Sequence, residues 1–202
     1  MSRIVVMNHV TLDGIMQGPG RADEDTRGGF RHGGWGQRSE APPDGALQKA
    51  MGERMTAGGG LSGWLFGRRS YEDLLSHWNQ QPDSPFGPML NNTPKYVVSS
   101  TLAQPLPWPN STLLRGAVAD AVGELKAHTD GVLAIMGSGE LIAALLAADL
   151  IDELLLMIHP LVLGNGRRLF PDNVDVSLRL LESTTTSSGV VIAVYESDRD
   201  SA

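Results

Sequence analysis

Two predicted strand-to-helix junctions carry residue types suited to binding an anion. Residues 67–70 read Gly-Arg-Arg-Ser where a helix is expected to begin. Residues 135–141 read Ile-Met-Gly-Ser-Gly-Glu-Leu, with two glycines between an apolar strand and an apolar helix. Free N–H groups and the positive dipole end at a helix N-terminus favour phosphate, and glycine permits close backbone approach. Taken alone, each segment is also compatible with an ordinary turn.

A third segment strengthens this interpretation. Residues 95–101 read Lys-Tyr-Val-Val-Ser-Ser-Thr, which places three hydroxyls at the carboxyl end of a predicted parallel strand. Open α/β sheets bind ligands at those ends, so the three segments together predict a nucleotide cofactor. A nucleoside triphosphate is disfavoured because the chain has no G-x-x-x-x-G-K-S/T loop. The full dinucleotide fingerprint and the hydrolase nucleophile elbow are also absent, since Ile142 and Met136 occupy positions that need glycine.

Three residues are candidates for moving a proton: Asp13, Asp25 and His32. A histidine has a pKa suited to acid–base work, although a single loop histidine is more often a surface residue. Asp13 precedes Gly14, and its alternative role is a turn residue that bonds its own backbone. Asp25 belongs to the acidic cluster 23–25, whose alternative role is a solvated face. The sequence does not choose among them, and water remains an alternative donor.

The same stretch supplies candidates for contacting a substrate, namely Phe30, His32 and Trp35. Phe30 and Trp35 would wall an apolar pocket, with loop packing as the alternative role for both. Met16 is a further candidate for such a wall, and loop packing is the favoured reading for it.

Composition limits the classes of protein and partner. The chain has 202 residues, no cysteine and a formal net charge of −7. Without cysteine there are no disulfides, thiolate metal sites or cysteine nucleophile, and no metal site is predicted. A net acidic protein is a poor partner for duplex nucleic acid. With no signal-peptide core and no apolar run of membrane-spanning length, we expect a soluble cytoplasmic protein.

The predicted elements alternate for most of the chain. Strands are predicted over 3–10, 61–66, 95–99, 113–115, 132–136, 150–163, 177–186 and 190–195. Helices are predicted over 46–55, 70–78 (with Ser70 as the cap), 117–127 and 140–148, with a short one near Met89. This order indicates an α/β fold with a mainly parallel sheet, helices on both faces and antiparallel C-terminal strands. We expect one domain over 1–197, a disordered tail over 198–202, and a satisfied core histidine at His159.

The order of these motifs resembles the dihydrofolate reductase-like superfamily, in the branch related to the reductase domain of riboflavin biosynthesis. The resemblance covers Arg3 to Tyr195, and residues 25–35 look like those of uncharacterised bacterial members. The segments that carry it are 10–14, 67–72, 95–99, 136–141 and 158–164. It implies a three-layer dihydrofolate reductase-like fold, NADP(H) as cofactor, a small-molecule substrate and a homodimer.

The resemblance also implies roles for individual residues. Phosphates of the adenosine half, including the 2′-phosphate, would contact Arg68, Arg69, Ser70, Ser99 and Ser100. Diphosphate and nicotinamide would pass Gly67, Gly137, Ser138, Gly139, Glu140 and Leu141, beside a turn formed by Thr11, Asp13 and Gly14. Arginine suits a 2′-phosphate, which favours NADP over NAD.

Two departures from the family narrow the function. No carboxylate aligns with the pterin-binding acid of dihydrofolate reductase, which disfavours folate as the substrate. A cysteine-free chain of this length cannot include the zinc deaminase domain that often accompanies the riboflavin enzyme. We therefore expect an NADPH-dependent reductase acting on a small cyclic or conjugated C=N or C=O compound, pterin-, pyrimidine- or flavin-like. The alternative is a non-catalytic protein that senses NADP(H) or a pterin-like ligand.

Overall fold

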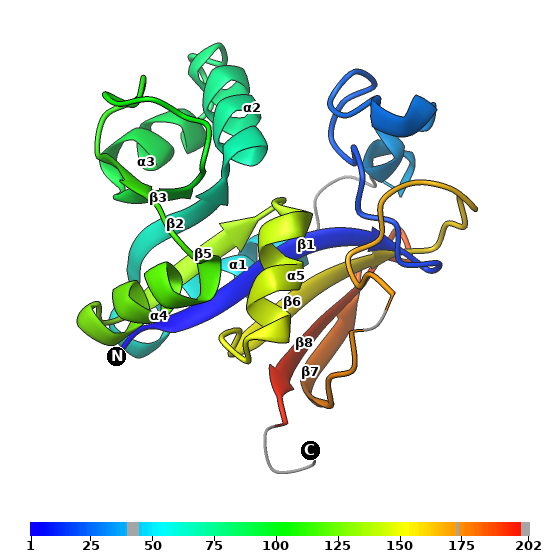
Figure 1. The fold of residues 1–202 in the computed structure, drawn as a ribbon. Helices are drawn as coiled ribbons and strands as arrows, with labels where there is room; N and C mark the ends of the chain where they lie inside the picture. Colours follow the sequence, from blue (N-terminus) through cyan, green and yellow to red (C-terminus); the bar gives the residue numbers. More distant parts are fainter. Residues whose placement is uncertain (40–44, 173, 199–202) are drawn as a thin grey trace. The chain divides into compact units, whose positions relative to one another are not determined.

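The computed structural model describes residues 1–39, 45–172 and 174–198, and these form eight strands and five α-helices (Figure 1). The strands are β1 (Arg3–Thr11), β2 (Leu61–Gly67), β3 (Lys95–Val98), β4 (Ser111–Leu114), β5 (Val132–Met136), β6 (Glu153–His159), β7 (Leu178–Thr185) and β8 (Val191–Ser197). The helices are α1 (Ala46–Thr56), α2 (Arg68–Asn79), α3 (Phe86–Asn92), α4 (Val118–His128) and α5 (Gly139–Ala147).

The strands form one mixed sheet in the order β4-β3-β2-β5-β1-β6-β8-β7. It is mostly parallel with antiparallel C-terminal strands, as predicted. The chain divides into two compact units: unit one comprises residues 1–5 and 54–151, and unit two comprises residues 6–53 and 152–202. The single domain expected over 1–197 stays a prediction.

Unit one places the carboxyl ends of several parallel strands at one edge of the sheet. β2 pairs in parallel with both β3 and β5, and β3 pairs in parallel with β4. The register aligns Gly67 with Val98, and Val98 with Leu114. Helix α2 follows β2 directly and α5 follows β5 after a two-residue turn (Figure 1). The predicted junctions therefore lie on neighbouring strands.

The buried side chain of Lys95 also stabilises unit one. Lys95 is fully buried, and its Nζ donates to the carbonyls of Leu90, Asn91 and Thr93 at 2.6, 3.3 and 2.9 Å. These bonds satisfy the carbonyl end of α3, a need that every helix C-terminus has. Burial lowers the pKa of Lys95 to about 8.

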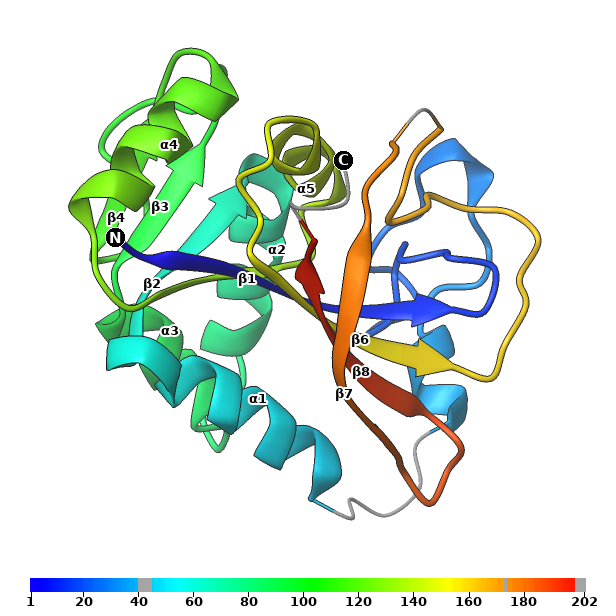
Figure 2. The ribbon, with the colours of Figure 1, turned by 90° about the horizontal axis from the view of Figure 1, so that it is seen from below.

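Unit two contains the rest of β1, the C-terminal strands and a long segment without regular structure. β8 is antiparallel to β6 and β7, and β7 is the edge strand (Figure 2). Residues 12–39 include two short 3₁₀ turns, Arg27–Gly29 and Trp35–Ser39. Five glycines here, at 14, 18, 28, 29 and 34, adopt positive φ, which interrupts helical or strand periodicity.

Two predicted boundaries are wrong. Helix α2 begins at Arg68 with Gly67 as its N-cap residue, so Ser70 lies inside the first turn and is not the cap. The strand predicted over 150–163 is shorter, because β6 ends at His159 before Pro160. In the predicted tail, the N–H of Asp198 donates to the carbonyl of Ser177 at 2.9 Å, and residues 199–202 lie outside the described residues. Across the described ranges, no helix combines the length and apolarity needed to cross a membrane.

Candidate functional site

Two serines join the two strand-to-helix junctions of unit one. The N–H of Gly67 donates to Oγ of Ser138 at 3.0 Å, and the N–H of Ser138 donates to Oγ of Ser70 at 2.7 Å. Ser138 adopts a left-handed backbone conformation with φ 56° as the N-cap residue of α5. The N-termini of α2 and α5 are thus held together at the carboxyl edge of the parallel strands.

Glycine is required at the centre of this arrangement. Gly137 has φ +69°, and a Cβ built on it would lie 2.8 Å from Oγ of Ser70. No side chain fits there without moving the serine, so the backbone stays open to a close approach. Gly139 begins α5, and Leu141 is buried with 5% of its surface exposed. The predicted 137–141 segment therefore presents backbone and hydroxyl groups, with the Leu141 side chain in the core.

The two predicted arginines lie beside carboxylates on the helices. Arg68 pairs with Glu72 at 3.4 Å, and Arg69 pairs with Glu140 at 3.6 Å. The four side chains are 40% to 74% exposed, so water screens these pairs and both guanidiniums can exchange partners at small cost. Glu140 lies in the first turn of α5, where the helix dipole favours a carboxylate.

The loop after β3 supplies the third predicted element and a residue that sequence reasoning missed. Oγ of Ser99 accepts the N–H groups of Thr101 and Leu102, both at 3.1 Å, and Ser100 is exposed. Arg115, directly after β4, donates to the carbonyl of Leu102 at 2.7 Å and to that of Ser100 at 3.4 Å. The sequence could have indicated Arg115, because it is a cation at the end of the predicted strand 113–115, next to the predicted strand that carries Ser99.

In unit two, Asp13 is bound by amides from a distant part of the chain. Its carboxylate accepts the Thr11 hydroxyl at 2.5 Å, the N–H of Gly164 at 2.7 Å and the N–H of Leu163 at 3.3 Å. Burial alone would raise the pKa of Asp13, but these hydrogen bonds outweigh it and lower the pKa below its ordinary value. Asp13 is therefore an ionised anchor beside Gly14, whose φ is +79°.

Asp25 is likewise held as a carboxylate. It accepts Nε of Arg27 at 2.7 Å and the backbone N–H of Arg27 at 3.1 Å, and it also pairs with Nη2 of that arginine. Burial acts to raise the pKa of Asp25, and the Arg27 hydrogen bonds and charge lower it overall. Both aspartates predicted to move a proton are thus stabilised in the form that has no proton to give.

The predicted substrate residues lie together, but two of the three are largely buried. Phe30 and Trp35 form a cluster with Ile15 and have 5% and 0% of their surfaces exposed. His32 packs edge-on against Phe30 with ring centroids 5.6 Å apart. The indole N–H of Trp35 donates to the carbonyl of Gln17 at 2.6 Å. Trp35 therefore packs the segment, and the walls of an open pocket must come from other residues.

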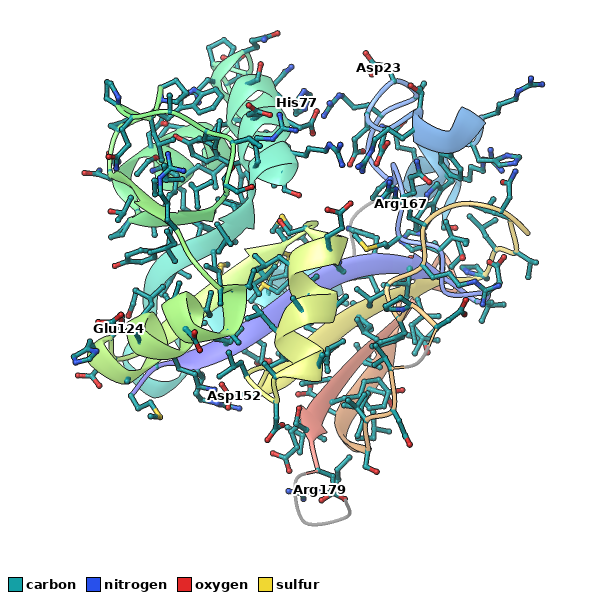
Figure 3. The ribbon with its side chains drawn as sticks, in the orientation of Figure 1. Asp23, His77, Glu124, Asp152, Arg167 and Arg179 are labelled. Carbon is teal, nitrogen blue, oxygen red and sulfur yellow. The ribbon has the colours of Figure 1, made fainter. Side chains whose placement is uncertain are left out.

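Phe30 also lines a cavity of about 250 Å³ on unit two. The other lining residues are Gln17, Arg27, Gly28, Asn165, Gly166 and Arg167. Gln17, which sequence reasoning missed, holds its walls: the amide nitrogen donates to the carbonyls of Asp25 and Arg27, and Oε1 accepts the N–H of Arg167 at 2.9 Å. Figure 3 labels Arg167 on the loop between β6 and β7.

Sequence reasoning also did not pair His9 with His159, two side chains of unit two. Nδ1 of His9 on β1 lies 2.8 Å from Nε2 of His159 at the end of β6. The prediction that His159 is a satisfied core histidine is only half confirmed, because it is buried but its Nδ1 has no hydrogen-bond partner among the described residues. Periodicity cannot pair histidines from strands that are 150 positions apart. In the described part of the chain, no group of three His, Asp or Glu side chains could hold a metal ion.

Comparison with known sequences gives a family match over most of the chain. The family of the RibD C-terminal domain matches residues 3–192. The Bacillus subtilis (strain 168) protein YyaP, itself uncharacterised, is 32% identical over 138 residues, which is 65% of this chain and 71% of YyaP.

Three solved structures share the fold. A candidate riboflavin biosynthesis protein from Shewanella sp. PV-4 has a TM-score of 0.71 at 24% identity, covering 98% of this chain and 99% of its own. A pyrimidine reductase-like protein from Corynebacterium diphtheriae has a TM-score of 0.61 at 12% identity, with 98% and 92% covered. Enterococcus faecalis dihydrofolate reductase, complexed with NADP(H) and RAB-propyl, has a TM-score of 0.60 at 13% identity, with 97% and 96% covered.

Proposed function

This chain belongs to the RibD C-terminal domain family, and from that premise we propose that it is an NADPH-dependent reductase. Its substrate would be a small cyclic or conjugated compound with a C=N or C=O bond, pterin-, pyrimidine- or flavin-like. The observation that carries the proposal is the pair of helix N-termini joined through Ser70 and Ser138 at the carboxyl edge of parallel strands.

The residues of unit one fit a dinucleotide diphosphate. Ser70 and Ser138 each accept a backbone N–H, so each hydroxyl keeps its own hydrogen for donation to an anion. The space that a Cβ on Gly137 would occupy lets a phosphate approach the backbone, and two helix dipoles favour negative charge there. These groups would hold and orient the cofactor.

Discrimination for NADPH over NADH is proposed to come from cations at the same edge. Arg68 and Arg69 begin α2, while Arg115 lies across the loop that carries Ser99 and Ser100. A 2′-phosphate would draw the two helix arginines away from their exposed carboxylates, because a doubly charged, three-oxygen acceptor binds a guanidinium fork more strongly.

The residues proposed to bind the substrate belong to unit two. We place the nicotinamide beside the turn of Thr11, Asp13 and Gly14, and the substrate near Phe30 and His32. When bound, NADPH supplies the hydride, and the protein supplies orientation and a proton. Asp13 and Asp25 are stabilised as carboxylates, so His32 or water is the proposed donor.

The ionised state of both aspartates also supports the alternative function, a protein that binds NADP(H) or a pterin-like ligand without turnover. Neither carboxylate supplies the proton that a reduction needs. Transfer of deuterium from C4-deuterated NADPH to a pterin, flavin or pyrimidine acceptor would establish the reductase. Tight NADPH binding with no transfer to any of the three would establish the sensor. No NADPH binding by calorimetry would reject both.

A homodimer is also proposed, on the family expectation. The edge strand β7 leaves Leu180 and Leu181 52% and 41% exposed. Sedimentation equilibrium of the full chain distinguishes a dimer from a monomer.

A further inference from the structure

The segment 18–39 of unit two packs on residues that precede and follow it in the chain. Phe30 and Trp35 pack on Ile15, with Leu161 and Leu163 beside them. Trp35 also packs edge-on against the imidazole of His159, with ring centroids 5.1 Å apart and planes at 88°. The Gln17 amide adds hydrogen bonds to the carbonyls of Asp25 and Arg27. His159 is therefore part of the surface on which the segment rests.

The histidine pair beneath Trp35 is arranged for neutral rings. One proton lies between Nδ1 of His9 and Nε2 of His159, which are 2.8 Å apart, so one ring donates and the other accepts. If both rings become imidazolium, both facing nitrogens carry hydrogens and neither can accept. The hydrogen bond is then lost and the rings repel each other. Charge on His159 would also be buried against the indole of Trp35.

The charged groups on the elements next to the pair are carboxylates bound elsewhere or cations. Asp13 on the turn after β1 is bound by Thr11, Leu163 and Gly164. Asp25 is bound by Arg27 within the segment. The loop after β6 contributes the cations Arg167 and Arg168, and the β8 residue paired with Ile158 is apolar Val191. Among the described residues, the side-chain hydrogen bond of each ring is to the other ring.

We propose that the His9–His159 pair is a proton-linked latch that keeps the 18–39 segment docked while both rings are neutral and favours its release when they take up protons. The docked segment covers His159 through Trp35. Burial lowers the pKa of each ring to about 4, with the neighbouring imidazole adding to the effect on His9. Release returns both rings to water, where the pKa is about 6.5.

The sign of the linkage follows from these values. Below pH 6.5 the released form binds more protons than the docked form, so acid favours release. Each histidine contributes up to about tenfold in the opening equilibrium per pH unit between 6.5 and 4. Between pH 7.0 and 5.5, two histidines together give an increase of between about tenfold and a hundredfold. The latch acts whichever ligand the protein binds, so it does not depend on the proposed reductase.

Hydrogen exchange of the full-length protein measures the opening directly. After correction for the intrinsic rate of each amide, protection over 18–39 is expected to fall by tenfold or more from pH 7.0 to 5.5. Amides of β5 in unit one provide the internal reference. The variant His159→Gln, which keeps a polar side chain of similar reach, should lose about half of this pH dependence on a logarithmic scale, because His9 remains. Removing the exposed His128 in His128→Gln should leave it intact. Equal protection of 18–39 at both pH values in the unmodified protein would overturn the proposal.

Nitrogen-15 NMR of the histidine rings keeps the test valid should His159→Gln fail to fold. In the unmodified protein, two coupled imidazoles should stay neutral at pH 5.5 and share one hydrogen bond. Two rings that titrate near pH 6.5 while 18–39 stays protected would show that docking and protonation are independent, and would also overturn the latch.

Discussion

The backbone N–H of Ser138 donates to the side-chain oxygen of Ser70 at 2.7 Å, and this bond links helix α2 to the turn before α5. The two residues are 68 positions apart. Two turns that would each be ordinary alone become one surface, the one proposed to bind the cofactor's phosphates, because each serine fixes the backbone of the other junction.

Replacing Ser70 with alanine should loosen this surface. The partly buried N–H of Ser138 would lose its acceptor, at a cost of ~1–3 kcal/mol, and the proposed phosphate would lose a donor. We expect NADPH affinity by calorimetry to fall by about tenfold or more. Ser76→Ala, at an exposed position on the same helix, is the matched control. Equal effects of the two variants would contradict the assignment.

Gly137→Ala tests the close approach. The new Cβ would lie 2.8 Å from Oγ of Ser70 at a φ of +69°, so we expect a loss of roughly 1–3 kcal/mol in stability together with weaker NADPH binding. Gly123→Ala in α4 is the control, because no atom lies within 4 Å of the place that its new Cβ would take. Urea unfolding should show Gly123→Ala unchanged or more stable by about 0.5–1 kcal/mol. Unimpaired NADPH binding by a folded Gly137→Ala protein would contradict the proposal that a phosphate closely approaches the backbone at Gly137.

Removal of the arginines tests the cofactor preference. In Arg68→Ala/Arg69→Ala, binding of NADPH should weaken by at least about tenfold more than binding of NADH, because only NADPH carries the 2′-phosphate. Arg115→Ala should likewise weaken NADPH binding more than NADH binding. Arg179→Ala, which removes a cation paired with Glu196 in unit two, should leave it unchanged. Equal weakening of both nucleotides would show that these arginines do not recognise the 2′-phosphate.

Asp13→Asn should lower the free energy of unfolding more than it changes any proton transfer. An amide cannot accept from Thr11, Leu163 and Gly164 as a carboxylate does, so a loss of about 1–3 kcal/mol is expected by urea unfolding. The exposed Asp23 gives the control Asp23→Asn. A fully stable Asp13→Asn protein would mean that the carboxylate does not anchor the loop after β6.

Global stability should fall in mild acid because of the histidine pair. The pKa of each ring is lowered from 6.5 to about 4 in the folded state, so the unfolded chain binds more protons below pH 6.5. Stability is therefore lost as the pH falls from 6.5 to 4, by on the order of 2–5 kcal/mol in total. Urea unfolding at several pH values gives the free energy of unfolding as a function of pH. Between pH 6.5 and 4 this free energy should fall less steeply for His9→Gln than for His128→Gln. If the two variants lost stability equally with falling pH, the histidine pair would not be the cause of the acid sensitivity.

Much of the fold follows from local pattern in the sequence. The apolar run at 132–136 predicts a strand at its observed bounds, because the run ends at a glycine turn. For helix α2 the sequence predicts too late a start, since Ser70 has the residue type of a cap while its hydroxyl bonds to Ser138 instead. The strand predicted over 150–163 is too long, because apolar residues continue past Pro160 into the loop after β6.

The missing parts of the candidate site are all contacts between distant positions. Residue type suggests Asp13 as a proton carrier, and only the fold shows its carboxylate filled by amides of Leu163 and Gly164. Gln17 gives no signal, because a single glutamine in a loop has no pattern. His9 is inconspicuous until β1 and β6 bring it to His159.

The bond between Asp13 and Gly164 also bears on when the protein can fold during its synthesis. The two residues are 151 positions apart, so the carboxylate leaves the ribosome long before its amide partner exists. Neighbouring β6 and β8 are also made late. Such non-local closure slows folding. Unit two therefore completes its structure only when nearly the whole chain has emerged, and truncation before residue 164 would leave the N-terminal turn without its anchor.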